Sequence, residues 1–273
     1  MDRSCKFLKI CEQLETNKID FQKKTNTPAM KLLKEIFGRI FALWALLLFS
    51  STMLIALVFY LPCFVLGEPQ KAKWHRSVSR VWMWIYLQLI GCPLKIKGAA
   101  YFNGLPNCVI VCNHSSLMDV PVTTPFMPRA NKTIAKKSMS RMPVFGWLYS
   151  FGSVLVDRKD ENSRRKSYDD MKHVLAAGID MLIYPEGTRN RTGKPLREFH
   201  NGAFRLAIDT GKPVVPTVLF NTAKALPPGK TFFLWPHTLE MHFLPPQQSS
   251  NISGEELKEK VFKMMWDYYE ANR

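Results

Sequence analysis

The chain has 273 residues, of which 47% are hydrophobic and 12% aromatic, so it can bury a sizeable core and its composition excludes a disordered protein. A formal net charge of +16 predicts an anionic partner, and nucleic acid, a phospholipid surface and a phosphorylated substrate all meet that requirement. Six cysteines without a CxxC pair indicate neither a zinc site nor a small disulfide scaffold, which favours a reducing compartment.

The N-terminal part divides into a polar and basic tail over residues 1–35 and a membrane-anchoring helical segment over residues 36–92. Within the second segment, residues 40–67 contain no Asp, Glu, Lys or Arg. As one helix these 28 residues would extend about 42 Å, against roughly 30 Å for the hydrocarbon core of a bilayer. Among the possible anionic partners, the apolar run therefore indicates a membrane. We assign no function to the tail.

Two arrangements of this anchor fit the sequence. The first is a single tilted span that ends or kinks at Pro62. The second is a re-entrant hairpin that turns at residues 50–52 (SST) and returns to the side from which it entered. Basic residues flank the run on both sides, so the positive-inside rule gives it no direction and mildly favours the hairpin. A buried helix in a soluble core is the weaker alternative, because such helices seldom continue this far without a charge.

A short helix is expected over residues 80–92 (RVWMWIYLQLIGC). Its aromatic residues Trp82, Trp84 and Tyr86 suit either the interface of a membrane or the packing of a core. Both interpretations stay open at this point.

From Leu94 onward, short β-branched runs alternate with longer helical patterns. This alternation predicts an α/β domain over residues 93–273 with a largely parallel, helix-covered sheet. In such sheets, sites lie at the carboxyl ends of the strands. The expected strands are residues 94–98, 108–112, 132–135, 153–157, 181–185, 213–220 and 239–244, and the expected helices lie near residues 116–126, 161–177, 200–211 and 254–271.

The first candidate site follows the strand "CVIVC". His114 stands at its carboxyl end, and a turn before the next helix can bring Asp119 back to the imidazole. A carboxylate that accepts from one ring nitrogen leaves the other free as a general base. Two alternatives compete: Ser116 and Asp119 also fit a helix-capping box, and Cys112, which faces the same side as His114, could be a thiolate nucleophile.

Two further candidate sites follow later strands. In "MLIYPEGTRNRTGKPLREF", Gly187 permits a tight turn, and Glu186, Thr188 and Arg189 extend from it. Arginine offers a planar fork that suits phosphate. In "FGSVLVDRKD", Arg158 lies beyond another strand, where a surface ion pair with Asp157 or Asp160 is the alternative role.

These segments, in this order, resemble the glycerophospholipid acyltransferase family, and most closely its 1-acylglycerol-3-phosphate acyltransferases. "NHSSLMD" matches the family's His-x4-Asp motif, "GSVLVDR" resembles its second block, "PEGTR" its third and "VVPTVLF" its fourth. The segment "AKKSMSRMPVFGWL" also looks like the family's connection between the first two blocks. The resemblance spans roughly residues 75–245, and four ordered motifs are more specific than any one of them. Asn190 departs from the pattern, since serine commonly follows the arginine of "PEGTR".

The resemblance implies transfer of an acyl group from acyl-CoA or acyl carrier protein to the sn-2 hydroxyl of 1-acylglycerol-3-phosphate (lysophosphatidic acid), which gives phosphatidic acid. His114 would be the general base and Asp119 would orient it. The resemblance further implies no metal and no cofactor beyond the acyl donor, and no nucleic acid. The implied substrate-binding residues are Lys136, Arg158, Glu186, Gly187, Thr188 and Arg189.

Because the lipid substrates reside in a bilayer, the expected location of the active site is the cytoplasmic face of a membrane, and the expected membrane is the bacterial inner membrane. Three alternatives remain. The acceptor could be glycerol 3-phosphate or another lysophospholipid, the chain could be a thioester hydrolase that uses Cys112, or it could be a membrane-anchored binder without catalysis.

Overall fold

The fold is centred on a seven-stranded sheet, seen in a computed structural model that describes residues 28–142 and 145–273. The strand order is β1-β7-β6-β2-β5-β3-β4, and every neighbouring pair is parallel except β6 and β7. This confirms the predicted α/β class with a largely parallel sheet. The strands are β1 (Leu94–Lys97), β2 (Val109–Cys112), β3 (Asn131–Lys136), β4 (Ser153–Val156), β5 (Asp180–Ile183), β6 (Val214–Phe220) and β7 (Leu239–Phe243).

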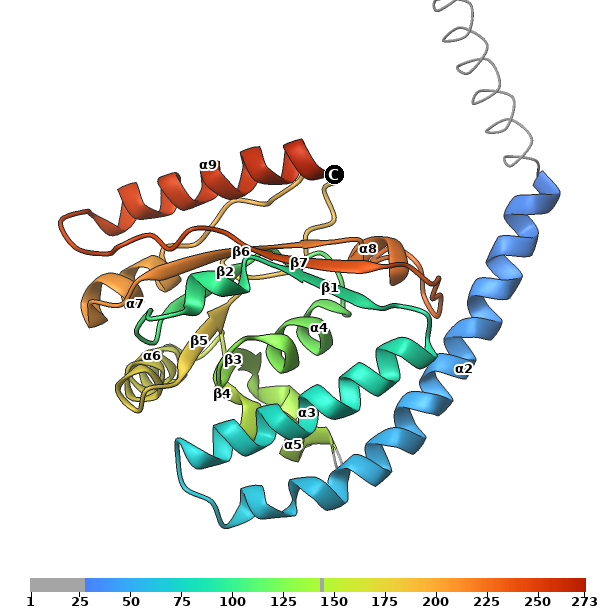
Figure 1. Ribbon diagram of the computed structural model, residues 1–273, viewed down its shortest axis with the longest axis horizontal. Coiled ribbons are helices and arrows are strands. Elements are labelled where there is room, and N and C mark those ends of the chain that lie inside the picture. Colours follow the sequence, from blue (N-terminus) through green and yellow to red (C-terminus); the bar gives the residue numbers. More distant parts are fainter. Residues whose placement is uncertain (1–27, 143–144) are drawn as a thin grey trace, which may run out of the picture.

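Helices cover both faces of this sheet (Figure 1). Helices α3, α4 and α5 lie on one face, and α6, α7 and α9 pack on the other. The predicted tail falls mostly outside the described residues, and its last part already belongs to α2. The helices are α2 (Pro28–Tyr60), α3 (Gln70–Leu89), α4 (Asp119–Phe126), α5 (Phe145–Gly152), α6 (Glu161–Ala176), α7 (Gly202–Thr210), α8 (Thr222–Ala225) and α9 (Gly254–Asn272), with 3-10 turns η1 (Leu61–Phe64), η2 (Ala99–Phe102) and η3 (Lys137–Arg141).

Strand β2 shows how one short apolar run serves two cores. All four of its residues are buried. Because successive side chains of a strand point to opposite faces, Ile110 and Cys112 join the core under α3 and α4. Val109 and Val111 join the core under α7 and α9. The absence of polar residues from this strand therefore follows from its central place in a sheet covered on both sides.

The predicted re-entrant turn at residues 50–52 is wrong, because α2 continues through it as one helix of 33 residues. The hydroxyls of Ser50 and Ser51 each donate to the carbonyl four residues earlier at 2.9 Å, and Thr52 does the same at 2.7 Å. Three hydroxyls in an apolar helix are thus satisfied without a break. The chain reverses later, in η1 and the residues before α3.

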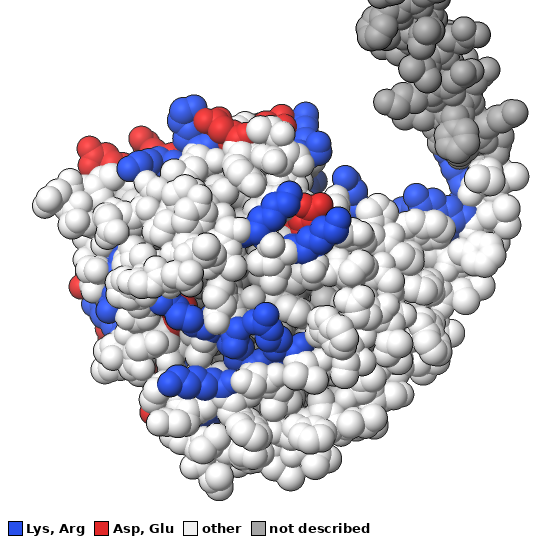
Figure 2. Space-filling model, in the orientation of Figure 1, with Lys and Arg blue, Asp and Glu red and all other residues white. Residues whose placement is uncertain are grey.

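Helix α2 packs on the domain along one side only. Its side chains Ala45, Ala56 and Tyr60 are buried, and Figure 2 shows an uncharged surface over most of its length. Only 17% of its most apolar stretch is buried, so α2 does not fit the alternative of a soluble core helix. Together with η1, this helix is long enough and apolar enough to cross a membrane. The aromatic residues of α3 take both of the positions considered for them, since Tyr86 is buried in the core, whereas Trp84 is exposed.

A buried ion pair fixes the starts of β2 and β5. Asp180 is 1% exposed, and its carboxylate accepts from the Cys108 amide at 2.8 Å and from Arg129 at 3.0 and 3.1 Å. The Arg129 guanidinium also donates to the carbonyls of Leu105 and Pro106. Burial raises the pKa of Asp180, and the guanidinium opposes that shift. The arginine therefore stabilises a carboxylate that water does not reach.

We expect Arg129→Met to lower the free energy of unfolding by about 3 kcal/mol, because it leaves Asp180 buried without its counter-charge. Thermal unfolding of the detergent-solubilised chain measures the effect. The matched control is Arg165→Met, which removes the exposed i,i+4 pair between Arg165 and Glu161 and should change stability by less than about 0.5 kcal/mol. Equal melting temperatures for the two variants would contradict the structural role of Arg129.

Candidate active site

The sheet topology brings the separate sequence motifs to one edge. Strands β2, β5, β3 and β4 are consecutive neighbours in the sheet and run in the same direction. His114 follows β2, Glu186 follows β5, Lys136 ends β3 and Arg158 follows β4. The carboxyl ends of parallel strands therefore gather residues that lie far apart in the chain.

His114 and Asp119 form the predicted pair. The imidazole Nδ1 lies 2.8 Å from Asp119 Oδ2, and the aspartate is fully buried. The same oxygen accepts from the backbone amides of Ser115 at 2.6 Å and Ser116 at 2.8 Å. Helix α4 begins at Asp119, so the carboxylate serves the imidazole and the helix start at once.

The alternative capping box at Ser116 does not form as a reciprocal pair. The Ser116 hydroxyl accepts from the Met118 amide at 3.1 Å and donates to the Leu226 carbonyl at 2.8 Å. Only the half in which Asp119 accepts from the Ser116 amide is present. Helix-start chemistry therefore accounts for part of the aspartate's contacts and the histidine for the rest.

The second nitrogen of the His114 ring is free to act. The ring stacks on Tyr184 with centroids 4.4 Å apart, and its side chain is 18% exposed. The Tyr184 hydroxyl is fixed in turn by Thr123 at 2.6 Å. No hydrogen bond from the described residues reaches Nε2. An oriented ring with one nitrogen on a carboxylate and the other open is suited to general-base chemistry.

Glu186 holds the backbone of the histidine. Its side chain is 1% exposed, and its two oxygens accept from the amides of His114 at 2.8 Å and Arg197 at 3.0 Å. The Asn190 amide donates to the His114 carbonyl at 2.6 Å. Burial raises the pKa of Glu186 to about 7. The carboxyl group thus joins the "PEGTR" loop to the end of β2, a role that its local sequence does not reveal.

Asn113 is a site residue that the sequence reasoning missed. Its side-chain amide donates to the Leu219 carbonyl at 3.1 Å, and its oxygen accepts from the Leu219 amide at 2.7 Å. Two bonds to one residue of β6 fix the position from which the chain turns toward His114. The signal available in the sequence was an amide side chain directly after a buried strand, where it can replace a lost backbone partner.

The cationic residues divide into one that is bonded and two that are not. The Arg158 guanidinium donates to the Gly187 carbonyl, so it joins two of the sequence motifs, and within the described residues the alternative surface pairing with Asp157 or Asp160 does not form. Arg189 is half-buried and Lys136 exposed, and neither side chain makes a hydrogen bond or ion pair with any residue in the described ranges. These two cations keep their binding capacity for a ligand.

The remaining members of the "PEGTR" loop shape the turn. Gly187 has a φ of +67°, and a Cβ there would lie 2.8 Å from the His200 ring. Both facts require glycine. Thr188 is exposed at the tip of the turn. Over residues 28–142 and 145–273, no cluster of three His, Cys, Asp or Glu residues could hold a metal ion.

Cys112 has the environment of an inert thiol. It is fully buried, and burial, with Asp119 and Glu186 nearby, raises its pKa well above the ordinary value. Its nearest polar contact is Asn113 Oδ1 at 3.9 Å. A nucleophilic cysteine needs an accessible thiolate, and this environment disfavours it.

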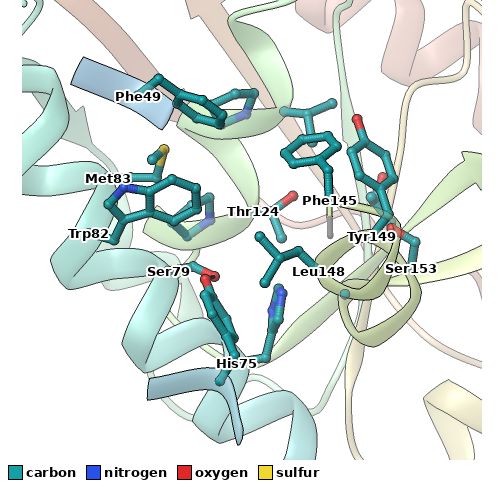
Figure 3. A pocket seen from close by; sticks show the side chains of 16 residues that line it. Phe49, His75, Ser79, Trp82, Met83, Thr124, Phe145, Leu148, Tyr149 and Ser153 are labelled. Atoms are coloured by element: carbon teal, nitrogen blue, oxygen red, sulfur yellow. Dashed lines mark hydrogen bonds between the residues drawn. The ribbon is translucent and has the colours of Figure 1, made fainter. Parts of the chain in front are cut away.

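A cavity of about 110 Å³ lies between helices α2 to α5 and the sheet (Figure 3). Val120 and Pro121, which directly follow Asp119, line one part of its wall. Polar groups interrupt the wall elsewhere: burial lowers the pKa of His75 to about 4, so its ring is neutral, and the Thr124 hydroxyl has no partner among the described residues. The apolar part of the lining comprises Phe49, Trp82, Met83, Phe145 and Leu148.

Comparisons with known proteins agree on one family. Residues 93–219 match the family model described as Acyltransferase. A 1-acyl-sn-glycerol-3-phosphate acyltransferase of Cocos nucifera is 34% identical over 146 residues, which are 53% of this chain and 45% of that protein. The chloroplastic 1-acyl-sn-glycerol-3-phosphate acyltransferase LPAT1 of Arabidopsis thaliana is 31% identical over 208 residues, which are 74% of this chain and 56% of that protein. The chain therefore spans about half the length of the curated relatives it matches.

A solved structure shares the fold. The crystal structure of the 1-acyl-sn-glycerophosphate acyltransferase PlsC from Thermotoga maritima superposes with a TM-score of 0.74 at 22% identity. The match covers 86% of this chain and 96% of that one. It therefore includes helices that precede residue 93 as well as the α/β domain.

We expect Glu186→Gln to be less stable than the parent chain, because the glutamine NH2 group faces a backbone amide that then lacks an acceptor. The difference should depend on pH. Since burial raises the folded pKa of Glu186 to about 7, its protonated form contributes stability below about pH 4.5, and that contribution is lost as the pH rises through about 7.

Melting temperatures of both proteins between pH 4.5 and 8 test this expectation. The gap between them should be widest at the acidic end and narrow toward pH 8. Parallel pH profiles would show that Glu186 does not titrate in that range.

Proposed function

We propose, because residues 93–219 of this chain match the family model described as Acyltransferase, that the protein transfers a fatty acyl group from an acyl thioester to the sn-2 hydroxyl of 1-acyl-sn-glycerol-3-phosphate, which gives phosphatidic acid. The observation that carries this proposal is the His114–Asp119 pair, an oriented base with no nucleophile of its own. In direct transfer the attacking oxygen belongs to the acceptor, so the enzyme needs only the base.

Each step of this mechanism uses groups of the site. His114 Nε2 takes the proton of the acceptor hydroxyl as its oxygen attacks the thioester carbon. Asp119, bonded to Nδ1, orients the ring and offsets the charge of the imidazolium. As the tetrahedral intermediate collapses, the C–O bond is kept, the C–S bond breaks, and the imidazolium proton passes to the leaving thiolate. The products are the ester and a free thiol of CoA or acyl carrier protein.

Phosphate binding falls to the cations at the same edge of the sheet. The side chains of Arg189 and Lys136 have no partner among the described residues, and Arg158 is fixed to the loop that carries Arg189. A guanidinium can bind two phosphate oxygens at once and so hold the acceptor in one orientation near the base. Glu186, Gly187 and Thr188 set the shape of that loop.

The cavity between helices α2 to α5 and the sheet suits the apolar part of the acyl donor. Its wall of Phe49, Trp82 and Phe145 offers apolar contact, and Val120 and Pro121, which directly follow Asp119 in the chain, line another part of it. An acyl chain bound there removes apolar surface from water.

Attachment to a membrane follows from α2. One side of the helix packs on the domain from Ala45 to Tyr60, and the opposite side exposes residues such as Leu47, Ile55 and Val58. A helix packed on a water-exposed domain along its length lies in the surface of a bilayer rather than across it. This arrangement brings the active site to lipid substrates, and the cytoplasmic face is where thioester donors occur.

Acyl transfer by the detergent-purified chain tests the proposal. Labelled acyl-CoA and acyl carrier protein are each offered 1-acylglycerol-3-phosphate or glycerol 3-phosphate. We expect phosphatidic acid from the former acceptor, and a loss of about 100-fold or more in His114→Ala, because the base is removed. His173→Ala, at an exposed position of α6, is the matched control. Transfer only to glycerol 3-phosphate would correct the acceptor, and full activity without the imidazole would overturn the mechanism.

Cys112→Ala separates direct transfer from a covalent mechanism. Since the thiol is buried and its pKa is raised, we expect kcat to stay within about threefold of the parent value. The measurement is the initial rate of transfer together with the rate of thioester hydrolysis. A loss of both rates as large as that of His114→Ala would indicate an acyl-cysteine intermediate instead.

A further inference from the structure

The loop that connects α8 to β7 is bound to the N-terminal third of α2. Within this segment, which we call the 227–236 loop, the Leu234 amide donates to the Gly38 carbonyl at 3.1 Å. Arg39 donates to the Thr231 carbonyl at 3.3 Å, and an ion pair joins Lys230 to Glu35. Figure 1 shows the end of the domain that carries α8 lying beside α2.

The contact is built for close approach. Phe233 is 2% exposed and lies against Gly38, where a Cβ would be 2.1 Å from the phenylalanine ring. Only a residue without a side chain allows the loop this close to the helix backbone. The loop therefore has a fixed position next to the apolar helix.

Phe232 behaves in the opposite way to its neighbour. It is 46% exposed, and its φ of 53° lies in the left-handed region, which a bulky residue with a Cβ occupies only under strain. Because the ring is so exposed, this strained position contributes little burial of apolar surface to the folded chain. A strained, exposed aromatic residue at a fixed position points to a role outside the fold.

The part of α2 to which the loop is bound carries both apolar and cationic side chains. Leu33, Phe37 and Ile40 in this third of the helix are each at least half exposed. Lys34 lies over the Trp235 ring at 5.1 Å from its centroid. Figure 2 shows blue side chains where α2 meets the domain. The two segments, residues 28–40 and 221–236, together carry Lys31, Lys34, Arg39, Lys224 and Lys230 against a single acid, Glu35.

We propose that the 227–236 loop is a second membrane contact, in which Phe232 inserts beside α2 into an anionic bilayer and the surrounding lysines bind lipid phosphates. The inference rests on the proposed attachment of α2 to the membrane, because the loop is bonded directly to that helix at Gly38 and Arg39. An aromatic ring flanked by lysines matches the interface of a bilayer, where apolar and anionic groups meet within a few ångströms. The bilayer is favoured over a protein partner because the loop is held against a helix of membrane-spanning length and composition.

Co-sedimentation of the full chain with vesicles tests the loop. Vesicles of phosphatidylcholine alone are compared with vesicles that contain phosphatidylglycerol. We expect Phe232→Asn to weaken binding to both kinds about tenfold, because an apolar insertion is lost. Asparagine tolerates the left-handed region, so the fold should be kept or stabilised, as a melting temperature will show. Tyr101→Asn, at an exposed aromatic residue of η2, is the control and should bind as the parent does.

Lys224→Gln isolates the electrostatic part. It should weaken binding about fivefold on anionic vesicles and leave binding to neutral vesicles unchanged. Parent-like binding by both Phe232→Asn and Lys224→Gln would overturn the proposal.

Acyl transfer in detergent micelles, measured on the same variants, distinguishes the two levels of inference. Active variants with unaltered vesicle binding would refute the loop alone. A parent chain that fails to bind either kind of vesicle would refute the attachment of α2 as well.

Discussion

The carboxylate of Asp119 accepts three hydrogen bonds at one oxygen, and the geometry of the catalytic edge depends on it. One bond orients the imidazole of His114, and two fix the turn that returns the chain to the sheet. A buried charge requires such partners, because burial without them would be costly. The contacts that pair this buried carboxylate therefore also place the base.

A second buried carboxyl group, that of Glu186, also holds His114 in place. It holds the histidine by its backbone while Asp119 holds it by its ring. Since the two acids come from loops after neighbouring strands, the histidine cannot shift without disturbing both. Rigid support from separate elements is what an oriented base requires, because small displacements of a reacting group reduce the rate steeply.

Sequence reasoning recovered the elements whose signal is local. Each expected strand is an apolar or β-branched run, and each is present within a residue or two. Helix α5 was missed, since glycines at both ends and a mainly apolar composition hide its helical period. The turn expected at residues 50–52 failed because hydroxyls can bond within a helix as well as in a turn. The contacts of Asn113 and Glu186 join residues far apart in the chain, and no window of sequence contains both partners.

The exposed apolar side of α2 also governs how the molecule behaves in a test tube. Without lipid or detergent, that side is a large contiguous patch of the kind that soluble monomers rarely present to water. Two copies would cover it by pairing helix to helix, and further copies would add at the ends left uncovered. An oligomer seen by light scattering in plain buffer would then result from the absence of lipid or detergent around this helix. It would carry no information about a physiological assembly.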